Sequence, residues 1–466
     1  MSRVVSNQAA RFILVCLLIS IVIVSEAKDL LSSAVSSSAA QKTATNSKPS
    51  GGTPNKLIAV KVTGTAHYTD QEILAASGLQ LGQNAADADF KEAVQLLGNS
   101  GLFSNVVYSY SFSNAGTRLE LQVTDADQSK LVPANFENFV WWTDAELHAL
   151  LQSRVPLFKQ LLPMTGNLPD RVAEALQAIL SEKNYPGRVD FQRSEEEPGS
   201  HPNAIDYRVE EVGIQIRNLE FPGASPEQSA LLAIAGRRLQ GAEYRRSSLA
   251  AVTKFDLLPV YLQRGYLKAA FAPSDARVVQ PASPTDADKQ NPAEILVDAI
   301  LPVAPGKVYS TSGVDWKGNS AIKTSEVAPL LHLPAGQPAD AVRLLHDVEN
   351  VGKLYRSRGY MAVEIKPDAQ LGDEKSTVHY DLKIVEGELY RMGELEILGL
   401  DTQAKARMHA AWTLREGEPY NADYPKKFLE DTRQLLPRGV QWSVSVHETP
   451  DAKEMTVDVE IRFKQQ

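Results

Sequence analysis

One helix-to-strand junction recurs along this chain, and its spacing limits what the chain can fold into. Residues 354–365 read LYRSRGYMAVEI: an amphipathic helical run stops at a glycine, an aromatic residue follows, and an alternating, strand-like run begins. Similar junctions turn at five pivot residues, which are Gly101, Asn184, Gly265, Gly359 and Gly439. Successive pivots lie 83, 81, 94 and 80 residues apart. A near-constant period indicates an array of small repeated units.

The pivots have a common physical explanation. A helix that ends tightly often places its next residue in the left-handed backbone region, which glycine reaches without a steric penalty and which asparagine tolerates better than most residues. We therefore interpret the five pivots as structural. The aromatic residues that follow two of them, Tyr266 and Tyr360, are expected to fold back onto the helices and plug the core.

Each period has the same internal pattern. An alternating apolar strand comes first, and a turn follows, often at a glycine such as Gly318. Two helical segments come next, for example 324–332 and 340–358, and apolar residues recur in the second at helical spacing. Two strands, such as 361–366 and 378–387, close the period. The order β-α-α-β-β predicts an α+β fold built as a linear array of about five small units.

The N-terminal residues have the pattern of an export signal. Basic residues precede the apolar run 12–24, and the small residues Ser25 and Ala27 permit cleavage after Ala27. A retained membrane anchor is the alternative, although the run is shorter than the roughly 20 apolar residues that span a bilayer. Residues 28–56 are rich in Ser, Ala, Thr, Lys and Gly, so we expect a disordered linker there.

Composition and motifs exclude several functional classes. The net charge of −9 argues against a nucleic-acid binder, because such proteins neutralise phosphates with basic side chains. The one cysteine, Cys16, lies in the apolar run, so the cleaved chain would contain no disulfide and no thiolate metal site. No phosphate-binding loop, zinc-protease helix, nucleophile elbow or EF-hand loop is present. We therefore expect a non-enzymatic protein with no cofactor and no catalytic or metal-binding residues.

Two local clusters have alternative interpretations. Tyr244-Arg245-Arg246 forms a basic patch in an acidic chain, which we interpret as a solvated helix start rather than a contact with a partner or an anionic lipid. Trp141-Trp142 is interpreted as one core and one surface aromatic rather than an interface anchor.

The repeated features resemble the polypeptide-transport-associated (POTRA) domain, the periplasmic repeat of outer-membrane β-barrel assembly and two-partner secretion proteins. The resemblance is carried by LYRSRGYMAVEI and by VHYDLKIVEGELYRMGELEILGL at 378–400, where a strand ending in Val-x-Glu-Gly leads through an aromatic to a next strand ending in glycine. It is weakest in the second unit, which has no clear first-strand glycine. The expected units are 57–127, 128–212, 213–305, 306–388 and 389–466.

The resemblance implies a three-stranded mixed sheet in each unit, with two helices on one face and the second strand at a sheet edge. An open edge can accept an extended peptide as an added strand through backbone hydrogen bonds. The candidate edges are Phe103–Phe112 and two shorter runs, namely Leu267, Lys268, Ala269, Ala270 and Phe271, and Met361, Ala362, Val363, Glu364, Ile365 and Lys366. Lys268, Glu364 and Lys366 leave open the alternative that these edges are protected against pairing.

These observations lead to two functional hypotheses. Family members usually end in a transmembrane barrel, but no run of alternating strand-length segments follows the fifth unit, so only the soluble docking function is expected here. The first hypothesis is a periplasmic docking or chaperone-like scaffold for outer-membrane protein assembly or secretion. Its partners would be unfolded clients or a separately encoded β-barrel, and it would meet the membrane only through its N-terminus or a partner. The alternative is a structural or division-type envelope scaffold held by a retained N-terminal anchor.

Overall fold

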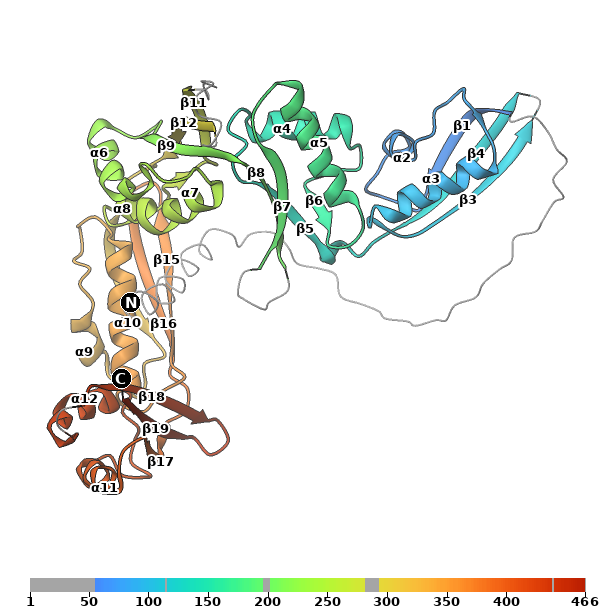
Figure 1. Ribbon diagram of the computed structural model, residues 1–466. Helices are drawn as coiled ribbons and strands as arrows, with labels where there is room; N and C mark the ends of the chain where they lie inside the picture. Colours follow the sequence, from blue (N-terminus) through green and yellow to red (C-terminus); the bar gives the residue numbers. More distant parts are fainter. Residues whose placement is uncertain (1–54, 114, 196–201, 281–292, 438–439, 466) are drawn as a thin grey trace. The chain divides into compact units, whose positions relative to one another are not determined.

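The computed structural model describes residues 55–113, 115–195, 202–280, 293–437 and 440–465 (Figure 1). The expected export signal, the expected linker up to residue 54, and the pivot Gly439 lie outside the described residues. By spatial contact the described chain divides into two bodies, one made of 55–253 with 271–303 and the other of 254–270 with 304–465. No helix within the described ranges is long and apolar enough to cross a membrane.

Repeat 1 opens the first body and shows the expected β-α-α-β-β order. Its elements are β1 (Asn55–Thr63), α2 (Asp70–Ala76), the short β2 (Asn84–Ala85), α3 (Asp87–Asn99), β3 (Phe103–Ser113) and β4 (Gly116–Asp125). β4 runs parallel to β1 and antiparallel to β3, so the sheet is mixed, in the order β2-β1-β4-β3. Alternate β4 residues are buried, and the Thr69 hydroxyl and the Glu72 carboxylate close a capping box at the start of α2.

Repeat 2 has the same topology with a longer approach to its second helix. It contains the 3-10 turn η1 (Gln128–Lys130), β5 (Leu131–Phe136), α4 (Asp144–Arg154), β6 (Leu161–Pro163), α5 (Leu168–Glu182), β7 (Arg188–Ser194) and β8 (Ala204–Glu210). The sheet order is β6-β5-β8-β7. Buried side chains of repeats 1 and 2 form one continuous hydrophobic cluster, so these two repeats share a core.

Repeat 3 has its sheet and its first helices in the first body. Its elements are β9 (Val212–Glu220), α6 (Pro226–Ala235), η2 (Arg237–Leu239), α7 (Arg246–Val252), the π-helical turn η3 (Thr253–Leu257), α8 (Leu258–Leu262), β10 (Ala270–Phe271), β11 (Asp275–Gln280), β12 (Ala293–Ile300) and β13 (Val303–Ala304). β12 pairs parallel with β9 and antiparallel with β11. The segment 254–270, which includes α8, groups with the second body.

Repeats 4 and 5 make up most of the second body. Repeat 4 contains β14 (Ser310–Lys317), α9 (Thr324–Val327), η4 (Ala328–Leu330), α10 (Ala341–Arg356), β15 (Glu364–Gly372) and β16 (Thr377–Val385). Repeat 5 contains β17 (Arg391–Leu398), α11 (Thr402–Ala411), α12 (Tyr424–Asp431), η5 (Arg433–Leu435), β18 (Trp442–Asp451) and β19 (Thr456–Gln465). Their sheets have the orders β14-β16-β15 and β17-β19-β18.

The predicted fold class is therefore confirmed: five mixed sheets follow one another, and each has its last strand in the interior. In repeats 1 and 2 a fourth short strand, β2 or β6, pairs antiparallel with the first strand. In repeats 3 to 5 the corresponding contact shrinks to isolated bridges, which are Gln215↔Glu243, Ser310↔Pro338 and Arg391↔Pro419.

The described pivots adopt the left-handed conformation that their interpretation requires. The φ angles of Gly101, Asn184, Gly265 and Gly359 are 81°, 55°, 81° and 92°. The following tyrosines pack edge-on against a tyrosine of the preceding helix: the Tyr360 and Tyr355 ring centroids lie 5.9 Å apart, and those of Tyr266 and Tyr261 lie 5.6 Å apart.

The pivots also join one repeat to the next, which the sequence pattern did not show. The Tyr390 backbone N–H, at the start of repeat 5, donates to the Gly359 carbonyl at 2.8 Å. A Cβ atom at Gly359 would lie 2.7 Å from the Tyr390 carbonyl oxygen, which is closer than real Cβ contacts come. Gly265 meets Tyr309 in the same way, with a 2.8 Å hydrogen bond. Glycine at these pivots is therefore needed for backbone conformation and for close contact between repeats.

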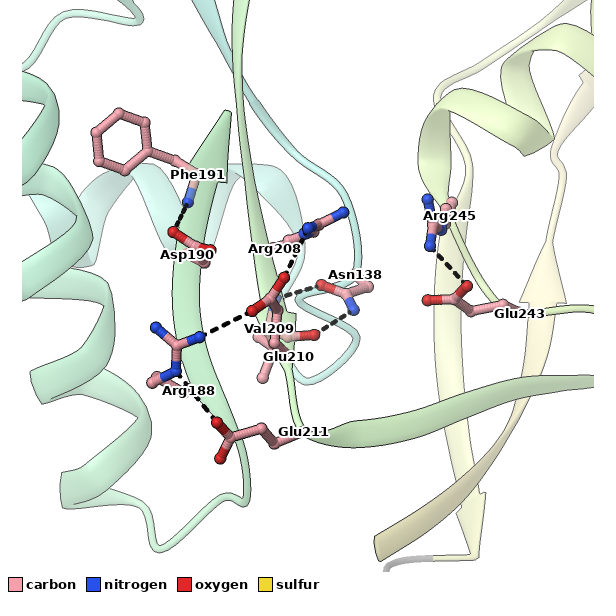
Figure 2. A network of polar contacts seen from close by, with 10 residues as sticks. All are labelled: Asn138, Arg188, Asp190, Phe191, Arg208, Val209, Glu210, Glu211, Glu243 and Arg245. Carbon is pink, nitrogen blue, oxygen red and sulfur yellow. Dashed lines mark hydrogen bonds and ion pairs between the residues drawn. The ribbon is translucent and has the colours of Figure 1, made fainter. Parts of the chain in front are cut away.

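Asn138 accounts for the missing first-strand glycine of repeat 2. In repeat 4, Gly318 follows the first strand, and a Cβ there would lie 2.1 Å from the Ile384 carbonyl oxygen of the last strand. In repeat 2 the buried Asn138 amide bridges to the last strand instead: it donates to the Val209 carbonyl at 2.9 Å and accepts from the Val209 N–H at 2.7 Å (Figure 2). A side-chain amide thus replaces a close backbone approach.

We expect Gly359→Ala to destabilise the contact between repeats 4 and 5 more than Gly336→Ala destabilises its own loop. Both glycines have positive φ, so each alanine should lower the free energy of unfolding by about 1–2 kcal/mol, because alanine is strained in the left-handed conformation. Only Gly359 has backbone within contact distance, since nothing lies within 4 Å of a Cβ at Gly336. Hydrogen exchange of β17 amides measures the difference. Equal protection in the two variants would contradict the role of Gly359 in the contact between repeats 4 and 5.

We expect Asn138→Ala to lower the free energy of unfolding of the first body by about 1–3 kcal/mol, because it leaves the buried Val209 N–H and carbonyl unpaired. Asn135→Ala is the control, because its exposed amide bonds only Asp206 on the surface. That change should cost at most about 0.5 kcal/mol. Urea denaturation of both variants provides the comparison, and equal costs would show that the Asn138 bridge is not needed.

Candidate functional site

Each of the five sheets has one edge formed by its second strand. These edge strands are β3, β7, β11, β15 and β18. The opposite edge is formed by the first strand or by the short strand beside it, and the first strand is partly covered by β2, by β6 or by an isolated bridge. The second strand is therefore the edge on which the described part of each sheet offers a long row of backbone groups.

The two short candidate edges are displaced from the observed strands. Met361, Ala362 and Val363 form a turn, in which Met361 N–H donates to Gly359 O at 3.0 Å, so β15 begins at Glu364 and includes Ile365 and Lys366.

The same correction is larger in repeat 3. Leu267, Lys268 and Ala269 form a turn, Ala270 and Phe271 form β10, and the edge strand is β11, which starts at Asp275. The physical reason is that the pivot leads into a second turn, not straight into a strand, with Leu267 N–H bonded to Gly265 O at 2.9 Å.

Four of the described edge strands carry charges or prolines. These residues are Arg188, Asp190 and Arg193 in β7, Asp275 and Arg277 in β11, Glu364, Lys366, Pro367 and Asp368 in β15, and Glu448, Pro450 and Asp451 in β18. Glu364 pairs with Lys366 at 2.8 Å, and the lysine holds the pKa of that carboxyl below its usual value. Charged side chains and prolines on an edge oppose pairing with another strand, so these edges are partly protected.

β3 differs from the other described edge strands. Its eleven residues, FSNVVYSYSFS, include no charged residue and no proline. Tyr108, Tyr110 and Phe112 point to one face at alternate positions, directly opposite Leu121, Leu119 and Thr117 of β4. Their exposure rises along the strand: Tyr108 is half-buried, Tyr110 is 37% exposed and Phe112 is 61% exposed. The strand therefore presents an open, uncharged backbone edge beside an aromatic row.

The aromatic row is held in place from α3. The Phe90 ring lies 5.1 Å from the Tyr110 ring and 6.2 Å from the Tyr108 ring, measured between centroids. The Tyr108 hydroxyl donates to the Asp87 carboxylate at 2.7 Å. Burial and the Asp87 charge raise the pKa of Tyr108 to about 12, so its hydroxyl remains a donor at physiological pH. The Tyr110 and Phe112 rings pack edge to face with their centroids 5.2 Å apart, and this pair ends the row.

The basic patch of repeat 3 makes contacts that the sequence interpretation missed. Tyr244 is buried, and Arg246 donates to the carbonyls of Phe136 at 3.0 Å and Trp142 at 3.3 Å, and pairs with Asp144 at 2.5 Å. The expectation of a solvated helix start is therefore wrong for Tyr244, which is buried, and for Arg246, which links α7 to repeat 2. Only hydrogen-bond partners distant in sequence reveal this role, so no local signal could have found it.

Figure 2 shows the surface network at the end of repeat 2. Arg188 and Arg208 pair with Glu210, and Arg188 also reaches Glu211 at 3.2 Å. Beside β9, Arg245 pairs with Glu243 at 2.7 Å. Every cation in this picture already has an acidic partner, so the network stabilises the strand ends and offers no unpaired cation to an incoming ligand.

One group of possible metal ligands lies close together within the described residues. Asp315, His379 and Asp381 have ligand atoms within 4.8 Å of one another. His379 Nε2 already lies 3.1 Å from Asp315, and Lys317 bonds Asp381 at 2.9 Å. Cross-strand ion pairs on an open sheet face explain this group, so we assign no metal to it.

Comparisons with known proteins identify the class of the repeat. Residues 309–387 match the family model described as "POTRA: Surface antigen variable number repeat". The match falls within the expected fourth unit and extends from just before β14 to just beyond β16. The chain is thus a POTRA-domain protein, and the matched region is repeat 4.

The similarity of this chain to a curated relative is distant. A curated relative, the "Putative outer membrane protein assembly factor" of Treponema pallidum (strain Nichols), is 22% identical over 206 residues, which are 44% of this chain and 23% of the relative. Less than a quarter of that relative's length is therefore matched.

Solved structures also resemble this chain. The POTRA3-5 structure of BamA from Haemophilus influenzae is 17% identical, with a TM-score of 0.39, over 54% of this chain and 96% of that one. POTRA1-3 of the periplasmic domain of Omp85 from Anabaena is 14% identical, with a TM-score of 0.24, over 54% and 95%.

Proposed function

We propose that this protein is a non-enzymatic scaffold of the cell envelope that holds extended segments of other proteins along its sheet edges, in outer-membrane protein assembly or secretion. The observation that carries the proposal is topological: in every described repeat the second strand lies at an edge and retains a row of backbone groups for an added strand. The POTRA match and the distant likeness to an outer-membrane assembly factor support the same class of role.

The proposed location is the periplasm for two reasons. The N-terminal pattern is that of an export signal, and the similar structure of Omp85 from Anabaena is described as part of a periplasmic domain. The partners would be unfolded outer-membrane or secreted proteins, and a separately encoded barrel is a further candidate partner. Backbone hydrogen bonds would supply affinity with little choice of sequence, while side chains beside each edge would set the preference.

Site-specific photo-crosslinking in cells tests this proposal. A photoreactive residue is placed at the exposed edge positions Ser109, Gln192, Gln370 and Ser445, one at a time, and at the exposed helix position Glu92 as a control. We expect crosslinks to outer-membrane or secreted proteins from edge positions and few from Glu92. Crosslinks distributed equally over edge and helix positions, or the absence of any envelope protein among them, would contradict the proposal.

A further inference from the structure

We propose that the edge of β3 is the main client-binding edge of the described chain, and that it selects amphipathic strands of about ten residues in which aromatic or aliphatic side chains alternate with small polar ones. This inference rests on the proposed function and names the substrate class and the repeat that binds it.

Access to a strand edge decides whether a further strand can be added there. An added strand must pair with a long backbone edge, and charged residues or prolines on that edge oppose pairing. Among the described edge strands β3 is the longest, with 11 residues, and it is the one without a charged residue or a proline. Its partner strand β4 pairs with it along nearly its whole length, so the backbone is held extended and ready for a further strand.

One face of β3 carries the aromatic row. Tyr110 and Phe112 extend the aromatic row that begins at Tyr108, and Phe112 is the most exposed of the three. An added strand would place its own side chains about 5 Å from these rings, where aromatic and aliphatic cross-strand pairs are favourable. Burial of the exposed rings would add to that preference. The segment therefore needs large apolar residues at every second position.

The opposite face of β3 is polar toward the C-terminal end of the strand. Ser109 and Ser111 lie there, across from Glu120 and Arg118 of β4, and Glu120 pairs with Lys61 of β1 at 3.2 Å. A shallow cavity of about 510 Å³ opens beside these strands, and its lining includes charged residues and serines together with apolar residues such as Ile58. Small polar residues at the alternate positions of the incoming strand suit this surface, whereas a segment that is apolar on both faces would remove water from these polar groups without replacing their hydrogen bonds.

Length and alternation together define the class of partner. A strand of about ten residues, apolar on one face and polar on the other, has the pattern of a transmembrane β-strand before it enters the membrane. Soluble sheets also contain such strands, but their backbone groups are already paired once the sheet has folded, so the partner is an unfolded or partly folded chain.

Direct binding to the purified chain tests the inference. The probe is a fluorescent ten-residue peptide in which Tyr, Phe or Val alternates with Ser or Thr, and the comparison peptide has the same composition with its apolar residues consecutive. We expect the alternating peptide to bind about tenfold more tightly, and to slow the exchange of β3 amides.

Two variants locate the binding, and each has a matched control in repeat 5. Phe112→Ser should weaken binding about three- to tenfold through the lost aromatic pair, and Ser111→Lys about tenfold through a charge on the edge. Val444→Ser and Ser445→Lys, at exposed positions of β18, should change it less than about twofold. Protected β4 amides in each variant establish that repeat 1 is folded.

The outcomes separate this inference from the proposed function. If the alternating peptide binds but the β3 variants bind it as the unmodified chain does, the inference is wrong and the scaffold function stands. If dimers form and Ser111→Lys abolishes them while the peptide does not compete, a second copy of this chain is the partner, which also overturns the inference. If neither peptide binds at millimolar concentration, the inference is again wrong, and the photo-crosslinks alone decide the scaffold function.

Discussion

The parallel pairing of the first and last strands of each repeat determines where every other element lies. Parallel neighbours cannot be joined by a tight turn, so the chain between them must cross over the sheet, and here two helices and one strand make the crossing. Since the last strand takes the central position, the second strand has no place except the edge. The free edge is thus a consequence of topology, present in all five mixed sheets of the described chain before any side chain is considered.

Side chains then decide which of these edges can be used. Glu364, Lys366 and Pro367 make the start of β15 a poor template, although its backbone geometry is that of an edge strand. β3 has the same place in its sheet and no such residues. Five edges with one topology therefore need not act as five equal binding sites.

The sequence predicts the repeat order and the described pivots because both depend on local chemistry. A glycine or asparagine after a helix reports a left-handed backbone, and the φ angles of Gly265 and Asn184 show that conformation. Other features depend on contacts between residues far apart in the chain. Asn138 bridges to Val209 and Arg246 to Phe136, and neither partner can be read from neighbouring residues. The displaced start of β11 has a third cause, a second turn after the pivot that no residue preference signals.

The pivots and the edges place opposite demands on the same short stretch of chain. At Gly359 the backbone must approach Tyr390 closely enough to exclude a Cβ atom, which fixes the end of α10 against repeat 5. Five residues later β15 begins, and it lies at the edge of its sheet with one side unpaired in the described chain. The intervening turn at 360–363 separates the two demands, because it absorbs the change of direction without using the hydrogen-bonding groups of the strand. A substitution at the pivot should therefore loosen the contact between repeats 4 and 5 while the backbone groups of the β15 edge stay in place. The contact between repeats and the strand edge can thus be altered independently.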